Sequence, residues 1–224
     1  MTNAQFASPD APVANVHCLV LDLRTHNPRK YWGDLLLCGA LFWGLVVLGS
    51  HSFVYLPITL TVGSLALYRM VLFSHEICHF KRGILPGFSL AWNVLCGVPM
   101  LLPSYMLKFH WRHHARSSYG TVADPEYLPF ATYPQIRSRF IWGALLVPMA
   151  MAVRALLLVP AAWFSDAWRT YLREHMTFMT MHSDFRPGPD TALSLPETLT
   201  EVGTTVLIWG LLISSRSLTE QKKY

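Results

Sequence analysis

Charged residues are scarce in this sequence, at 14% of its 224 residues, against about 25% in soluble globular domains. Apolar residues take their place and make up 52% of the chain, with 13% aromatic residues. This balance argues against a soluble enzyme and is typical of a protein with several membrane-spanning helices. The length fits one such domain rather than two.

Basic runs with interleaved aromatic residues are also missing, which argues against a nucleic-acid partner. The net charge of +5 is better explained by Lys and Arg on the cytoplasmic side of a membrane. No C-x-x-C motif occurs and the cysteines are far apart, so disulfides are not expected and the cysteines are predicted to be small apolar fillers. They are Cys18, Cys38, Cys78 and Cys96.

Residues 1–30 contain no short apolar run that ends in a small-residue cleavage site, so no signal peptide is predicted. They are mostly polar, and we expect them to form a polar N-terminal segment in the cytoplasm. The remainder, 31–224, is predicted to be a single membrane domain.

Two apolar runs, 35–49 and 53–73, approach the roughly 20 residues that a helix needs to cross a membrane. The polar residues Ser50, His51 and Ser52 separate the runs, which predicts a transmembrane helical hairpin. Lys and Arg flank the outer ends of both runs. By the positive-inside rule, both ends of the hairpin are therefore expected in the cytoplasm.

Three later apolar stretches complete the predicted fold. Residues 84–107 are broken by Pro and Gly, which favours a re-entrant or interfacial segment that returns to the same side of the membrane. Residues 140–163 carry Arg154 in their middle; they either span, or lie in the interface with Arg154 snorkelling to water. Residues 202–213 begin a further span. The predicted fold class is an all-α integral membrane protein with a transmembrane helical hairpin, re-entrant or interfacial helices and one or two further spans.

Five of the ten histidines fall in two short clusters. His75 and His79 are spaced i, i+4, and His110, His113 and His114 are spaced i, i+3, i+4. Such residues share one face of a helix, so each cluster would aim its imidazoles in one direction. Neutral imidazole is the commonest protein ligand for transition metals. We expect the two clusters to converge on a metal site, with ordinary surface histidines at a membrane edge as the plain alternative.

Acidic neighbours of the histidines are weaker candidates. Asp124 and Glu126 stand in a turn-rich segment and are candidate hydrogen-bond partners of the ligand histidines, although a capped loop explains them equally well. Glu76 is a candidate for the same role or a spacer within its cluster. Cys78 is predicted to be a spacer rather than a ligand.

The two clusters, the hairpin before them and the segment D-P-E-Y-L-P after them resemble the membrane fatty acid desaturase and hydroxylase superfamily. That family carries an H-x(3,4)-H box and then an H-x(2,3)-H-H box, which match H-E-I-C-H and H-W-R-H-H in this chain. The resemblance covers roughly residues 30–215. It implies that all five clustered histidines are metal ligands.

The resemblance also implies the chemistry. In the family the histidines hold two non-haem Fe ions on the cytosolic side of a multi-pass membrane protein, and O2 is used there to oxidise an acyl C–H bond. The substrate would be an acyl lipid within the membrane, and a ferredoxin or a cytochrome would donate electrons. Desaturation and hydroxylation use the same boxes, so the motifs leave both reactions open.

The family's third box, H/Q-x(2,3)-H-H, is missing from this sequence. The later histidines, His175 and His182, are seven residues apart and are expected to be solvated rather than metal-bound. Five imidazoles fall short of the ligands that two irons require, so residues 31–224 are predicted to be a desaturase-like domain that is incomplete at its C-terminus. We expect residues 1–224 alone to lack O2-dependent activity.

Two other functions stay open. H-E-I-C-H also matches the H-E-x-x-H motif of zinc hydrolases, including intramembrane metalloproteases, in which Glu76 would be the general base. That site needs a third ligand, usually an Asp in a distant apolar helix, and neither 140–163 nor 202–213 contains one. The other possibility is an inactive homologue that keeps the fold without turnover. Metal content distinguishes the three.

Overall fold

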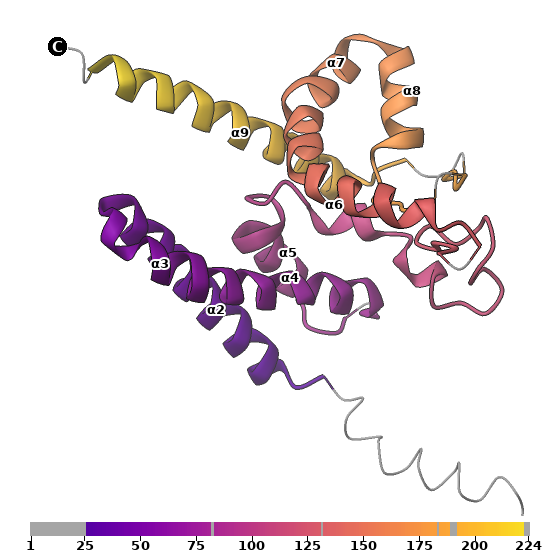
Figure 1. The fold of residues 1–224 in the computed structure, drawn as a ribbon, viewed down its shortest axis with the longest axis horizontal. Coiled ribbons are helices and arrows are strands. Elements are labelled where there is room, and N and C mark those ends of the chain that lie inside the picture. The colour runs from indigo at the N-terminus through magenta and orange to yellow at the C-terminus, as the bar shows by residue number, and fades with distance from the viewer. Residues whose placement is uncertain (1–25, 82, 131, 183, 189–191, 222–224) are drawn as a thin grey trace, which may run out of the picture.

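The computed structural model describes residues 26–221, apart from 82, 131, 183 and 189–191. Within that part the chain forms helices joined by turns and loops, without a β-strand (Figure 1). The predictions made for most of the N-terminal segment 1–30, including the one for Cys18, lie outside the described residues. The all-α fold class is confirmed.

The predicted hairpin is present. Its first arm is α2 (Pro28–His51), and its second arm runs through α3 (Leu56–Ile58) and a π-helical turn into α4 (Ser64–His79). The side chain of Asn27 caps α2 by accepting hydrogen bonds from the next backbone N–H groups, with Pro28 in the first turn, where its missing donor costs nothing. At the tip, Ser52 ends α2 in an extended conformation and its hydroxyl accepts from the N–H of Val54.

Polar side chains in the hairpin pair with one another across it. Asp34 on α2 forms an ion pair with Arg69 on α4, and the hydroxyl of Tyr31 donates to the Glu76 carboxylate over 3.1 Å. Buried apolar residues complete the contact between the arms, among them Leu35 and Met70, whose side chains are fully buried. Pairing lowers the cost of carrying charge into an apolar span.

In the part of the chain that the structure describes, four helical segments are long and apolar enough to cross a membrane: Pro28–His51, Phe53–His79, Gln135–Phe164 and Leu195–Ser215. Large apolar side chains remain exposed along them, including Phe53 at 88% and Val206 at 61%. Such outward apolar faces are expected where lipid rather than water surrounds a helix. The chain is a multi-pass membrane protein, and residues 140–163 lie within one of the four candidate spans.

A short return segment folds back against α4. It contains α5 (Phe88–Trp92), a π-helical turn over Asn93–Gly97, and a 3-10 turn over Ser104–Leu107. Phe88 and Trp92 are buried against α4, and the indole N–H of Trp92 donates to the carbonyl of Met70 over 2.7 Å. This packing brings the chain after Leu107 back to the end of α4 (Figure 1), as the proline-broken sequence predicted.

The second half of the chain forms α6 (Gln135–Val153), α7 (Val159–Phe164), α8 (Asp166–His175) and α9 (Leu195–Gln221). A π-helical turn over Arg154–Leu158 joins α6 to α7. The polar helix α8 turns back after the Ser165 cap and packs on α7. The N-terminal part of α9 is tied to the return segment, because Glu197 forms an ion pair with Lys108 over 3.1 Å.

Arg154 is buried and paired rather than snorkelling. Only 2% of it is exposed, and its guanidinium forms an ion pair with Glu201 of α9. The same guanidinium donates to the carbonyl of Met176 over 2.7 Å, while the hydroxyl of Tyr105 donates to Glu201 over 3.2 Å. Burial raises the pKa of Tyr105, which keeps this hydroxyl a donor. The snorkelling expected of Arg154 in the interfacial alternative therefore does not occur, because partners inside the protein take the place of water.

Replacing one member of this buried pair should destabilise the protein strongly. Glu201→Ala leaves the Arg154 charge without its partner, and we expect a loss of about 3 kcal/mol or more in unfolding free energy, the range known for broken buried pairs. Denaturant titration in detergent micelles measures this change. The double variant Arg154→Met/Glu201→Leu should recover most of the loss, because no unpaired charge remains.

The exposed pair of Arg169 and Asp166 on α8 supplies the control. Arg169→Ala should change stability little, because exposed ion pairs contribute little. Equal losses for Glu201→Ala and Arg169→Ala would contradict the structural role of the buried pair.

Candidate metal centre

The first histidine box lies in the last turn of α4. His75 and His79 are one helical turn apart, and their ring centroids are 4.8 Å from each other. Both rings point to the same side of the helix, as their i, i+4 spacing predicted. The following residue, Phe80, leaves the helical conformation, so the box occupies the end of the span.

The second histidine box is not α-helical. His110–Arg112 form a single 3-10 turn, and His113 and His114 follow in a turn. His110 and His114 still face one another, with ring centroids 4.8 Å apart. His113 stands apart from this pair: its ring centroid is 6.2 Å from that of His110, and its Nδ1 faces the carboxylate of Asp124. Helical phasing therefore predicted two of the three directions.

Four histidines come together from the two boxes. The His75 ring lies 4.7 Å from that of His110, and the His79 ring lies 4.7 Å from that of His114. Together with the two contacts within the boxes, these distances form the four sides of a folded quadrilateral. Its diagonals are only slightly longer, at 5.5 Å from His75 to His114 and 5.3 Å from His79 to His110, so the four rings are arranged as a flattened tetrahedron. One ligand nitrogen from each residue can be chosen so that all four lie within 4.8 Å of one another.

The donor set fits a transition metal. The Nε2 atoms of His110 and His114 are 3.0 Å apart, and two nitrogens bound to one ion at right angles, with bonds of about 2.1 Å, are separated by about 3 Å. Imidazole is a ligand that iron, zinc, copper and nickel all accept. That these residues bind a metal stays a prediction, and the geometry is compatible with it.

A carboxylate orients His110. Its Nδ1 lies 2.6 Å from Oε1 of Glu126, and this contact leaves Nε2 directed at His114. A metal-binding histidine commonly has its second nitrogen held in this way, which fixes the tautomer and the ring orientation. The hydrogen bond expected for Glu126 is therefore present.

Asp124 holds the fifth histidine. Its buried carboxylate lies 3.1 Å from Nδ1 of His113 and also accepts hydrogen bonds from the N–H groups of Gly120 and Glu126. Burial alone would raise the pKa of Asp124, but these backbone donors and His113 outweigh it and lower the pKa. His113 lies beside the group of four, with its ring centroid 5.5 Å from that of His114.

Glu76 faces α2 instead of the histidines. Its carboxylate accepts the hydrogen bond from Tyr31, and it does not line the cavity beside the boxes. A general base of a zinc hydrolase must reach the metal-bound water, so this placement weighs against that alternative. The hydrogen bond of Glu76 goes to Tyr31 and not to a histidine. The thiol of Cys78 donates to the backbone carbonyls of Ser74 and Leu107, as expected for a spacer.

Desolvation and neighbouring histidines favour the neutral form of His114. Desolvation lowers the pKa of His114, and the adjacent His110, His75 and His113 lower it further. A neutral imidazole retains the lone pair that a metal requires.

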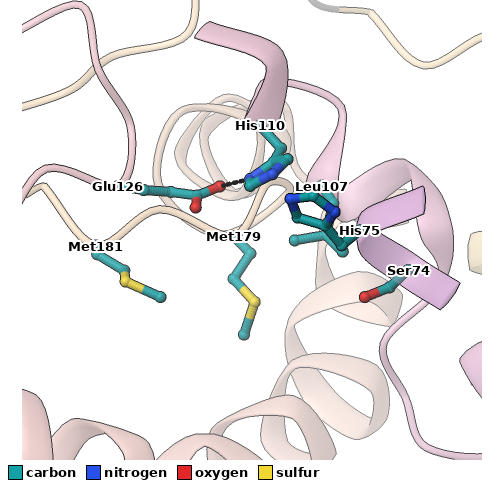
Figure 2. Close-up of a pocket in the computed structure, with 7 residues that line it drawn as sticks. All are labelled: Ser74, His75, Leu107, His110, Glu126, Met179 and Met181. Carbon is teal, nitrogen blue, oxygen red and sulfur yellow. Dashed lines mark hydrogen bonds and ion pairs between the residues drawn. The ribbon is translucent and has the colours of Figure 1, made fainter. Parts of the chain in front are cut away.

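A cavity of about 130 Å³ opens beside His75 and His110. Figure 2 shows Glu126 and the two thioether side chains of Met179 and Met181 on one side of it. These two methionines were not predicted as site residues from the sequence, although the alternation of Met in M-T-F-M-T-M indicates that side chains 179 and 181 share a face of an extended segment.

The same two methionines line a larger neighbouring groove of about 860 Å³ between α6 and the segment after α8. His175 and His182 line this groove rather than joining the four histidines. The cavity beside the candidate metal centre therefore adjoins this mostly apolar groove through two shared residues, Met179 and Met181.

Comparison with known proteins decides the family. Residues 48–212 match the fatty acid desaturase family. The chain belongs to this family. A ceramide hydroxylase from Caulobacter vibrioides (strain NA1000 / CB15N) is 34% identical over 186 residues, which is 81% of this chain and 53% of the relative. The chain therefore spans about half the length of that curated relative. No solved structure matches this chain significantly.

Removing the carboxylates that hold the histidines should weaken metal binding without destroying it. For Glu126→Gln and Asp124→Asn we expect a loss of about 10- to 100-fold in metal affinity, the usual effect of removing a partner of a ligand histidine. Titration of the purified protein with Co²⁺, followed by absorption, gives the affinity.

Glu174→Gln is the matched control, since Glu174 is exposed on α8 and does not belong to the histidine group. If Glu126→Gln bound cobalt as tightly as Glu174→Gln, the contact between Glu126 and His110 would have no part in metal binding.

Proposed function

We propose that this chain is the metal-binding part of an oxygen-dependent enzyme that oxidises an acyl C–H bond of a membrane lipid. The observation that carries the proposal is the convergence of His75, His79, His110 and His114 from two distant boxes. Membership of the desaturase family supports the reaction class. Both desaturation and hydroxylation fit these residues.

Two irons are the proposed metals. When bound, they would supply the activation of O2 that C–H oxidation needs. His75, His79, His110 and His114 would supply part of their ligand set, with His113 as a further ligand through the nitrogen that Asp124 leaves free. Glu126 and Asp124 would keep the rings of His110 and His113 in place.

The proposed substrate is a long-chain lipid of the ceramide type. The name of the Caulobacter relative supports this class, and the groove beside the histidines offers an apolar wall for a chain. Methionine and phenylalanine side chains dominate the part near Met106 and Phe178. Methionine adapts its shape to flexible apolar ligands, so the lining suits a hydrocarbon chain.

The site is proposed to face the cytoplasm, where a ferredoxin or a cytochrome would donate electrons. Basic residues surround the boxes, including Lys81, Arg112 and Arg116, and positive charge is characteristic of cytoplasmic segments. The same charges would attract an acidic electron carrier. The N-terminal end of α2 and the C-terminal end of α4 would then lie on this side.

Cysteine labelling tests the orientation. In a cysteine-free background, Pro28→Cys and Ile84→Cys should react with a membrane-impermeant maleimide only after the cells are opened. Val54→Cys at the hairpin tip should react in intact cells, since the tip is expected on the opposite side. Labelling of positions 28 and 84 from outside intact cells would reverse the topology.

Iron binding tests the metal centre. Residues 1–224 are loaded with Fe²⁺ without oxygen, and iron per chain is measured by elemental analysis. His110→Ala and His114→Ala should abolish binding, because a lost ligand removes part of the coordination shell. His51→Ala is the control, since His51 lies at the far end of α2. The proposal would be contradicted if the protein contained zinc instead of iron and if the His110→Ala and His114→Ala substitutions did not change the amount of zinc per chain.

Lipid analysis tests the reaction in the native organism. Deletion of the gene should remove a membrane lipid that carries one additional oxygen atom or one additional double bond, as mass spectrometry would show. The unaltered gene and its His51→Ala variant should restore that lipid, whereas the His110→Ala variant should not. An unchanged lipid profile after deletion would reject lipid oxidation as the function.

A further inference from the structure

The groove beside the histidines has one continuous helical wall. Its positions on α6 recur every three or four residues and thus lie on one side of the helix. They include Ile136, Arg139, Phe140, Gly143, Val147 and Met151. From Arg139 to Met151 this wall extends about 18 Å, at 1.5 Å per residue. The groove is therefore long enough to hold an extended lipid chain lengthwise.

The opposite wall is the segment that follows α8, and two contacts fix its direction. At one end, the carbonyl of Met176 accepts the hydrogen bond from Arg154, just beyond the C-terminus of α6. At the other end, the N–H groups of Met181 and His182 both donate to the carbonyl of Pro125, over 2.7 and 2.9 Å. The segment thus runs from the C-terminal end of α6 toward the residue that precedes Glu126.

The two ends of the groove differ in chemistry. Met106, Met151 and Phe178 line the end near Arg154, with His175 at the end of α8 as its polar residue. Tyr133 and Arg139 belong to the N-terminal end of the α6 wall, and His182 and Asp184 to the Pro125 end of the opposite segment. A chain of methylenes fits the first end, and a group that makes hydrogen bonds fits the second.

The polar end is the one that adjoins the histidines. Met181 lines both the groove and the cavity beside His75 and His110, and the next residue along the chain, His182, belongs to the polar end. Met179, the other shared residue, has its N–H bonded to the carbonyl of Met106 over 2.7 Å. The opening toward the histidines therefore lies where the polar end gives way to the apolar end.

We propose that the groove binds its lipid with a neutral amide or hydroxyl group beside Arg139, His182 and Asp184 and with the chain along α6. The oxidised carbon is then close to the polar group of the lipid, not in the middle of the chain. This end contains both a cation, Arg139, and a carboxylate, Asp184. A charged headgroup of either sign would meet one like charge there, so a neutral group suits this end. Only the reaction at that carbon rests on the proposed function; the orientation of the lipid does not.

Photo-crosslinking measures this orientation without turnover or bound metal. Residues 1–224 are placed in lipid nanodiscs with an N-acyl sphingoid lipid whose acyl chain carries a diazirine, either beside the amide carbonyl or at the terminal methyl. Mass spectrometry maps the modified residues. The label beside the carbonyl should modify 179–182, and the terminal label should modify 147–151 or 176–178.

Each other outcome overturns the proposal. The reverse pattern would place the polar group at the His175 end, with the methyl end at the histidines. Labelling confined to the outer faces of α2 or α9 would show that the groove holds no lipid. Because the readout needs no iron, a protein that fails the iron test but shows the expected crosslinks would reject the oxidation while retaining the lipid orientation.

Paired substitutions test the two ends separately. A Cβ at Gly143 would meet no atom within 4 Å, so Gly143→Leu fills the groove without a backbone clash and should reduce crosslinking at the chain end about tenfold. Gly210→Leu is its control, because Gly210 on α9 is equally open and lies outside the groove. Unchanged crosslinking in Gly143→Leu would overturn the placement of the chain.

At the polar end, Arg139→Gln should reduce crosslinking beside the carbonyl by about tenfold or more, the effect of losing one hydrogen bond to a charged donor. Arg137→Gln, two residues away on another face of α6, should leave it unchanged. Equal effects of the two substitutions would show that charge near the membrane, and not contact with the polar group, attracts the lipid.

Discussion

The packing of the return segment against α4 is the interaction on which the histidine arrangement depends. His79 and His110 are separated by 30 intervening residues, and imidazoles on a single span could not enclose a metal. Burial of Phe88 and Trp92, with the indole bonded to Met70, brings the second box back to the end of the span that carries the first. The side chain of Asn93 supports the same fold-back, since it accepts from the N–H of Ser104 over 2.8 Å.

The second half of the chain reinforces that arrangement from the other side. Lys108 and Tyr105, which immediately precede the second box, are bonded to Glu197 and Glu201 of α9. Arg154, which lies in the π-helical turn between α6 and α7, forms an ion pair with Glu201. Three elements thus meet just before His110, and the charged groups that an apolar helix carries at a cost are used where the helices must be held together.

Sequence reasoning succeeded where a pattern is local. The hairpin follows from two apolar runs and a polar break, and the pairing of His75 with His79 follows from helical spacing. The return of the chain to the end of α4 could also be predicted, because Pro and Gly interrupt the apolar stretch that follows α4. The direction of the His113 side chain could not be predicted, because the spacing of the second box was interpreted as α-helical. In the structure the box forms a 3-10 turn followed by an irregular turn. The groove was missed because its walls come from α6 and from 175–184, which the sequence shows only as a span and a loop.

Glycine at position 97 has a consequence for how this part of the fold can change through evolution. A Cβ there would come within 2.7 Å of both the Asn93 side chain and the Trp92 ring, and within 3.2 Å of the carbonyl of Leu102. Backbone and a large ring cannot both move aside in a packed interior. Homologues that keep this turn are thus confined to glycine here, while the neighbouring Val94, which is 63% exposed, is free to drift among apolar residues.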